Sequence, residues 1–160
     1  MIRRLLTLIG LSILAPMALA QDSYDPAPYA TCAACHLPDG NGVPGAFPPI
    51  RDRVAKIAAL DGGREYLVTV VAYGLMGTID VAGVQYFGVM AGNAGPMTAA
   101  DIAAALNYIV FELNDGDASS IEPFTAEEVE ATQAATTMKS PAGGGQLRTE
   151  LVGTHGAEWP

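Results

Sequence analysis

The residues best suited to chemistry form one short run, Cys32-Ala33-Ala34-Cys35-His36. Two cysteines separated by two residues and followed at once by a histidine are the attachment signature of a c-type haem. The two intervening residues make one turn, so both sulfurs can form thioether bonds to one edge of the macrocycle. The imidazole of His36 then lies under the iron as the proximal ligand. The run therefore predicts one covalently bound haem c.

Two other kinds of site also use a CxxC run. A redox dithiol of the thioredoxin type is expected beside a strand in a βαβ pattern, and no such pattern surrounds Cys32. A zinc site needs four ligands, whereas the chain contains only two cysteines and, besides His36, only His155. The sequence has neither the βαβ pattern of a redox dithiol nor the four ligands of a zinc site, which favours the haem interpretation.

The first residues resemble an export signal. Arg3 and Arg4 precede an apolar run over residues 5–14, and Ala18-Leu19-Ala20 offers small residues for cleavage. This pattern predicts a secretory signal peptide over residues 1–20, with a retained anchor as the alternative. Haem is attached to CxxCH outside the cytoplasm, so we expect a periplasmic protein. Removal of the signal changes the formal net charge from −9 to −11, which argues against binding to nucleic acid or to anionic lipid.

Two segments are expected to position the CxxCH run. Asp25-Pro26 predicts a helix start, with Asp as the cap and Pro at the first helical position, and this helix would bury Tyr29 and continue into Cys32. Residues 43–50 form an extended, proline-stiffened apolar segment. This segment could present a backbone carbonyl to Nδ1 of His36, or it could be a plain loop.

The rest of the chain predicts further helices and one hairpin. Helical spacing favours helices over residues 51–60 and 65–75, and alternation over residues 78–86 favours a small hairpin. A capping box at Thr98 opens a helix with an apolar stripe four, three and four residues apart, and a second capping box begins at Thr125. The stripe consists of Ile102, Leu106, Ile109 and Leu113. From residue 139 onward, a run of glycines predicts a flexible tail.

The sixth iron ligand decides whether small molecules can reach the iron. An open position would permit peroxide or gas chemistry, whereas a second protein ligand leaves electron transfer. The candidates are Met76, Met90, Met97, Met138 and His155. We favour Met90, because it lies in a loop between Gly88 and Gly92 that would let the backbone approach a flat macrocycle. Burial as a structural residue is the alternative for Met90. A core position is expected for Met76, and Met97 is expected to form a hydrophobic staple with Ile102.

These motifs together resemble the class I (mono-haem) cytochromes c. More narrowly, they resemble the soluble cytochromes c of thermophilic bacteria that donate electrons to a terminal oxidase. The likeness extends from about residue 29 to residue 130. It is carried by residues 29–36, 43–50, 62–67, 84–90, 102–109 and 123–129. The tail beyond Met138 does not follow the family.

The resemblance implies an all-α fold, with helices wrapped round one haem and a small β-hairpin before the loop of the methionine ligand. It also implies that Met90 is the sixth ligand and that the carbonyl of Pro48 steadies His36. Apolar side chains are the candidates for the haem pocket: Phe47, Ile50, Leu67, Val71, Leu106 and Ile109. The expected organisation is a signal over residues 1–20, a cytochrome domain over 21–138 and a flexible tail over 139–160.

The function implied is that of a periplasmic electron carrier rather than an enzyme. It would pass single electrons between respiratory redox proteins, as a monomer without a membrane span once the signal is removed, with a terminal oxidase as acceptor. Redox partners are expected to dock on an uncharged patch that consists of Thr31, Ala33, Ala34, Val43 and Ala46. The alternatives are a cytochrome subunit or relay of a periplasmic dehydrogenase or reductase, and an open-site haem enzyme or gas sensor.

Overall fold

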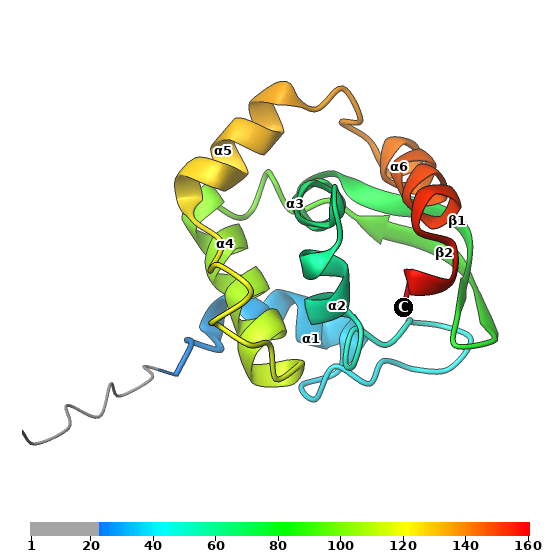
Figure 1. Ribbon diagram of the computed structural model, residues 1–160, viewed down its shortest axis with the longest axis horizontal. Coiled ribbons are helices and arrows are strands. Elements are labelled where there is room, and N and C mark those ends of the chain that lie inside the picture. Colours follow the sequence, from blue (N-terminus) through cyan, green and yellow to red (C-terminus); the bar gives the residue numbers. More distant parts are fainter. Residues whose placement is uncertain (1–22) are drawn as a thin grey trace, which may run out of the picture.

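The computed structural model describes residues 23–160, so the predicted signal peptide lies outside the described residues. Within this range, the structure has six α-helices and one two-stranded hairpin that lies at one side of the molecule next to α6, which agrees with the expected all-α class (Figure 1). Their bounds are α1 Ala30–His36, α2 Val54–Ala59, α3 Gly63–Tyr73, β1 Gly74–Val81, β2 Val84–Ala91, α4 Ala99–Asn107, α5 Ala126–Ala135 and α6 Pro141–His155. Across residues 23–160, the helices are all too short or too polar to span a bilayer.

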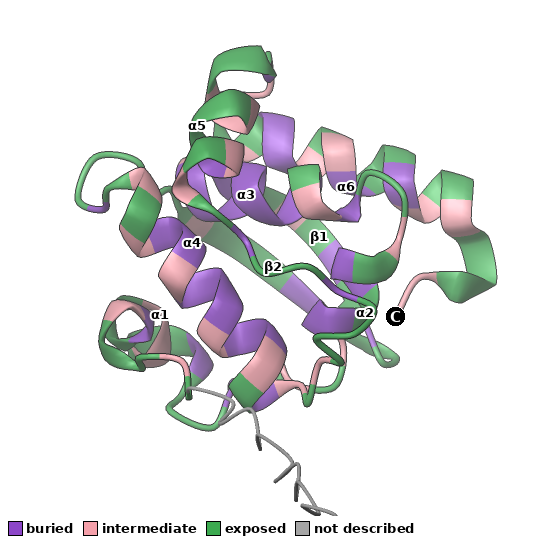
Figure 2. Cartoon of the chain, turned by 60° about the vertical axis from the view of Figure 1, so that its left-hand side comes forward, coloured by how far each residue is buried: buried purple, intermediate pink, exposed green. Residues whose placement is uncertain are grey.

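The core lies where α3 and α4 face the other helices. Val68 on α3 and Ile102 and Leu106 on α4 are completely buried, and Figure 2 shows buried residues concentrated on these helices. Each such side chain contributes roughly 1.5–3 kcal/mol when it leaves water. The predicted stripe of α4 is confirmed, since its four members are all buried. A π-helical segment, Tyr108–Leu113, continues α4 and carries the last two members.

The two predicted capping boxes have different outcomes. At α4, the Thr98 side chain accepts from the Asp101 N–H and Asp101 accepts from the Thr98 N–H, so the box is complete. At α5, Thr125 accepts from the Glu128 N–H, but the Glu128 carboxylate binds Arg64 on α3. At α5, therefore, Thr125 caps the helix, while Glu128 links α5 to α3 through its ion pair with Arg64.

The hairpin is longer than the sequence indicated. Its register pairs Leu75 with Met90 and Met76 with Val89, so β2 includes the residue expected in a glycine-flanked loop. The prediction of a Met90 loop is therefore wrong: the ladder of backbone hydrogen bonds continues through Met90 and ends at Ala91. The prediction that Met76 is a core residue is also wrong, because 46% of it is exposed on the face of β1 away from the core.

The C-terminal segment is a packed helix, and the predicted flexible tail over residues 139–160 is corrected accordingly. Helix α6 begins at a Ser140 cap with Pro141 in its first turn and packs on β1 and α3. Its glycines bring the helix into backbone contact with the strand. A Cβ on Gly144 would lie 2.2 Å from the Gly74 oxygen, and one on Gly145 would lie 2.3 Å from the Met76 oxygen. Glycine here permits close packing rather than flexibility.

This packing predicts that Gly144→Ala destabilises the protein. The added methyl group would have to push α6 away from the backbone of β1, and overpacking of this kind costs about 1–3 kcal/mol. Gly153 in the same helix has open space around it, so Gly153→Ala should instead stabilise the protein by roughly 0.5–1 kcal/mol. Denaturant unfolding of the two variants checks this. Equal stability of the two variants would contradict the close packing.

Candidate functional site

Helix α1 holds the CxxCH run and is fixed at both of its ends. At its start, Asp25 accepts a hydrogen bond from the Ala27 N–H in the 3-10 turn Ala27–Tyr29 that leads into the helix. The buried Tyr29 hydroxyl donates to the carbonyl of Leu37, just beyond the helix, at 2.6 Å. Burial raises the pKa of Tyr29, so the hydroxyl remains a donor. The turn that carries the two sulfurs is therefore held in one orientation.

The His36 ring is oriented by the proline-rich segment. Nδ1 of His36 lies 2.8 Å from the carbonyl oxygen of Pro48. A carbonyl can only accept, so Nδ1 carries the proton and Nε2 of the neutral ring keeps its lone pair. Burial of His36 lowers its pKa against the opposing effect of the Pro48 carbonyl, which further favours the neutral ring. The imidazole is thus prepared to act as a metal ligand.

The loop that supplies this carbonyl depends on a glycine. Gly42 has φ +62°, and a Cβ there would lie 2.3 Å from the Phe47 oxygen and 2.7 Å from the Pro48 oxygen. Its N–H donates to the His36 carbonyl at 2.9 Å, and Val43 and Phe47 form a small antiparallel bridge beyond it. The segment is therefore a tight turn rather than a plain loop, and it brings the Pro48 carbonyl to the histidine.

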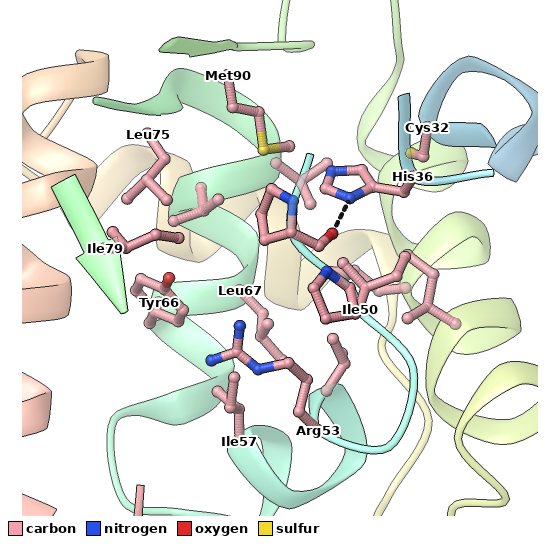
Figure 3. A pocket seen from close by; sticks show the side chains of 17 residues that line it. Cys32, His36, Ile50, Arg53, Ile57, Tyr66, Leu67, Leu75, Ile79 and Met90 are labelled. Atoms are coloured by element: carbon pink, nitrogen blue, oxygen red, sulfur yellow. Dashed lines mark hydrogen bonds between the residues drawn. The ribbon is translucent and has the colours of Figure 1, made fainter. Parts of the chain in front are cut away.

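Met90 faces His36 across the site. Figure 3 shows the thioether of Met90, carried by β2, pointing into the space beside the His36 ring. The other four candidates for a sixth ligand lie elsewhere. Met97 is buried in the core, Met76 is exposed, Met138 lies between α5 and α6, and His155 Nε2 is 2.9 Å from the Asp61 oxygen. Of the five candidates, the structure brings only Met90 together with His36.

A hollow lies between these two residues. It has two connected parts, which share Cys32, His36, Pro48, Leu75, Ile79 and Met90 as lining residues. The part toward the outer face contains about 1290 Å³ of space, some of it open to solvent. Five of the predicted pocket residues line the inner part: Ile50, Leu67, Val71, Leu106 and Ile109. Phe47 lines the outer part and is 41% exposed.

The residues around the hollow fit a flat apolar macrocycle. Phe87 is 82% exposed and Val89 is 65% exposed on β2, and both line the outer part, where a large planar group would cover them. Cys32 and Cys35 form no disulfide and lie at the same edge. Burial raises the pKa of Cys32, which disfavours the thiolate that a redox dithiol would need. Across residues 23–160 there is no group of three or more His, Cys, Asp or Glu side chains arranged for a metal ion.

Among the lining residues that the sequence did not predict, two are polar and belong to the inner part. Arg53 and Tyr66 bring polar groups to an otherwise apolar inner wall. Tyr66 precedes Leu67 and lies one turn before Val70, so the buried face of α3 could have included it. Arg53 lies just before α2, and the contacts that bury it come from distant parts of the chain, which local sequence patterns do not reveal.

Comparison with known proteins gives consistent matches. The family model described as Cytochrome c matches residues 26–110. A cytochrome c-552 of Thermus thermophilus is 47% identical over 129 residues, which cover 80% of this chain and 86% of that protein. A second cytochrome c-552 of the same species is 49% identical over 107 residues, covering 66% of this chain and 81% of that protein.

Proposed function

Because this chain belongs to the cytochrome c family, we propose that it carries single electrons between respiratory redox proteins in the periplasm, with a terminal oxidase as acceptor. It is an electron-transfer protein with covalently bound haem c, not an enzyme, and its partners are redox proteins. The observation that carries the proposal is the placement of Met90 opposite His36 in one apolar hollow. The haem supplies the reversible one-electron couple.

The proposed roles of the site residues follow from their positions. Cys32 and Cys35 form the thioether bonds, His36 is the proximal ligand and Met90 is the distal ligand. The Pro48 carbonyl holds the proton of His36 on Nδ1, and the β1–β2 ladder holds Met90. Two ligands fixed by the fold require little rearrangement when the charge of the site changes. The apolar wall excludes water and favours the less charged, reduced state.

The proposed docking surface is the uncharged patch around the sulfurs. Thr31, Ala34, Val43 and Ala46 are exposed there, and Ala33 is partly exposed. An electron must reach the macrocycle edge at this point, and the patch carries no charge that a partner would have to desolvate. Transient redox complexes have small interfaces, so we expect a weak complex, with the acidic surface around the patch affecting the rate of approach.

A pair of matched variants tests this function. Ala34→Glu puts a charge into the proposed docking patch, whereas Ala100→Glu makes the same change at an exposed position on α4. Oxidation of the reduced holoprotein by oxidase-containing membranes of the source organism should be slowed about tenfold by the first variant, which corresponds to about 1.4 kcal/mol, and not by the second. The reaction of the unchanged protein should also depend on salt concentration.

Three results would contradict parts of this proposal. Membranes that fail to oxidise the reduced protein would exclude the terminal oxidase as acceptor. Copurification with a large dehydrogenase or reductase would favour the alternative of a bound subunit or relay. Equal rates for Ala34→Glu and Ala100→Glu would exclude docking through the uncharged patch.

A further inference from the structure

Helix α2 begins without a capping side chain of its own. Arg53 occupies its N-cap position, and the Arg53 side chain makes no capping hydrogen bond there. Ser, Thr, Asp and Asn are the residues that usually accept hydrogen bonds from the unpaired N–H groups at a helix start. The residue before it, Asp52, has φ +62°, a conformation that residues with a Cβ rarely adopt. The start of α2 therefore has to be held by another part of the chain.

Asn114 supplies the missing cap from a distant segment. Its Oδ1 accepts hydrogen bonds from the N–H of Arg53 at 2.8 Å and from the N–H of Val54 at 3.0 Å. Its Nδ2 donates to the carbonyl oxygen of Ile109 at 2.9 Å. These partners fix the orientation of the amide, because an N–H only donates and a carbonyl only accepts. Since the π-helical segment ends at Asn114, one side chain serves both the end of this segment and the start of α2.

The two segments that Asn114 joins both line the inner part of the hollow. Val54 and Ile57 come from α2 and Ile109 comes from the π-helical segment, and the two segments pack against each other. Figure 3 shows Ile57 and Arg53 at the same end of this pocket. Asn114 itself does not line either part of the hollow. It therefore acts on the hollow through the residues that it holds.

The backbone groups that Asn114 binds have few other partners. Among residues 23–160, the N–H of Arg53 has no second acceptor, and the N–H of Val54 has only the Ile50 oxygen, at 3.4 Å. Without the Asn114 side chain, water would have to satisfy these groups and the freed Ile109 carbonyl. That water would enter between α2 and the π-helical segment, next to the apolar wall of the hollow.

We propose that Asn114 is a positioning residue for the haem. It holds α2 against the π-helical segment, keeps water out of the inner part of the hollow and thereby raises the midpoint potential. Solvent exposure is one of the properties that set the potential of a bound haem, and an apolar, water-free wall favours the reduced state. This inference rests on the proposed function. Asn114 lies beyond residues 26–110, which the family model matches.

The midpoint potential of Asn114→Ala, measured on the holoprotein, tests this role. At the ambient potential that reduces half of the unchanged protein, the ratio of ferrous to ferric haem in the variant should fall about tenfold, because water beside the haem favours the more charged ferric state. The sulfur-to-iron charge-transfer band should remain. Met90 is held by the β1–β2 ladder, and none of the three hydrogen bonds of Asn114 reaches that ladder.

Asn107→Ala is the matched control. Asn107 also joins two distant segments, since its Nδ2 donates to the Phe124 oxygen at 2.9 Å and its Oδ1 accepts from the Phe124 N–H at 2.7 Å. It ties α4 to the segment before α5 and does not line the hollow. Denaturant unfolding should show that both alanine variants are less stable than the unchanged protein, while the potential should fall only in Asn114→Ala.

An unchanged potential in Asn114→Ala, or an equal fall in Asn107→Ala, would overturn the positioning role and leave the proposed function intact. Loss of the charge-transfer band in Asn114→Ala would also overturn it, since the shift would then come from Met90 leaving the iron. If an alanine variant does not accumulate with haem, Asn114→Ser and Asn107→Ser replace the pair, because serine keeps a polar group but is shorter than asparagine. A fall confined to Asn114→Ser supports the role, and equal potentials overturn it. Failure of the proposed function is recognised separately, because the unchanged protein would then lack the spectrum of a haem with two protein ligands.

Discussion

Replacing Met90 with alanine is expected to open one face of the iron while leaving the haem attached. Helix α1 carries both cysteines and His36, whereas Met90 lies on β2. We therefore expect the haem attachment to be unaffected. The ferric protein should lose its sulfur-to-iron charge-transfer band, and the reduced protein should bind carbon monoxide readily. Because thioether ligation raises the potential of a haem, the midpoint potential should fall by an amount on the order of 0.1 V.

Met97→Leu is the matched control for this prediction. Met97 is a buried methionine just before the Thr98 cap of α4, so its replacement tests the loss of a thioether from the core without loss of the proposed ligand. It should keep the band, the potential and the resistance to carbon monoxide. An unchanged spectrum in Met90→Ala would show that the sixth ligand is another residue.

Replacing both cysteines is expected to abolish covalent haem altogether. In Cys32→Ala/Cys35→Ala no sulfur remains to form a thioether, so no haem should stay with the chain after denaturation. Without haem, nothing would fill the outer part of the hollow, about 1290 Å³, or cover the exposed Phe87 beside it. The folded state should therefore lose the free energy that a bound ligand contributes. Haem staining of a denaturing gel and the intact mass measure the loss.

Single cysteine variants and a neighbouring substitution serve as controls for the double replacement. Cys32→Ala and Cys35→Ala should each retain one thioether bond, with a lower yield of holoprotein. Ala33→Ser changes the same turn without removing a sulfur and should keep haem at the level of the unchanged protein. Haem that survives denaturation in the double variant would mean that another residue forms the covalent bond.

Several elements could be predicted because their signals are local. The CxxCH run lies within one turn, and the cap at Thr98 and the apolar stripe from Ile102 onward lie within a few turns of one helix. The choice of helix for α3 was also correct, even though four β-branched residues at 68–71 were compatible with a strand. In these cases spacing along the chain determines which atoms can meet, so the sequence pattern is sufficient.

Other features depend on contacts between distant segments and could not be predicted in the same way. Glycines at 143–145 have the composition of a linker, yet Gly144 and Gly145 allow α6 to lie against the backbone of β1. The glycines around Met90 indicated a loop, whereas pairing with β1 makes this segment a strand. Arg53 gave no local signal, because its neighbours Tyr66 and Pro160 reach it only after the chain has folded.

Exposure of the reduced, unmodified holoprotein to carbon monoxide, followed by visible absorption, tests the central claim most directly. A haem closed by His36 on one face and Met90 on the other should keep its reduced spectrum, while Met90→Ala measured beside it should change at once. Rapid formation of a carbon monoxide complex by the unmodified protein would contradict this account and would favour an open-site haem protein instead.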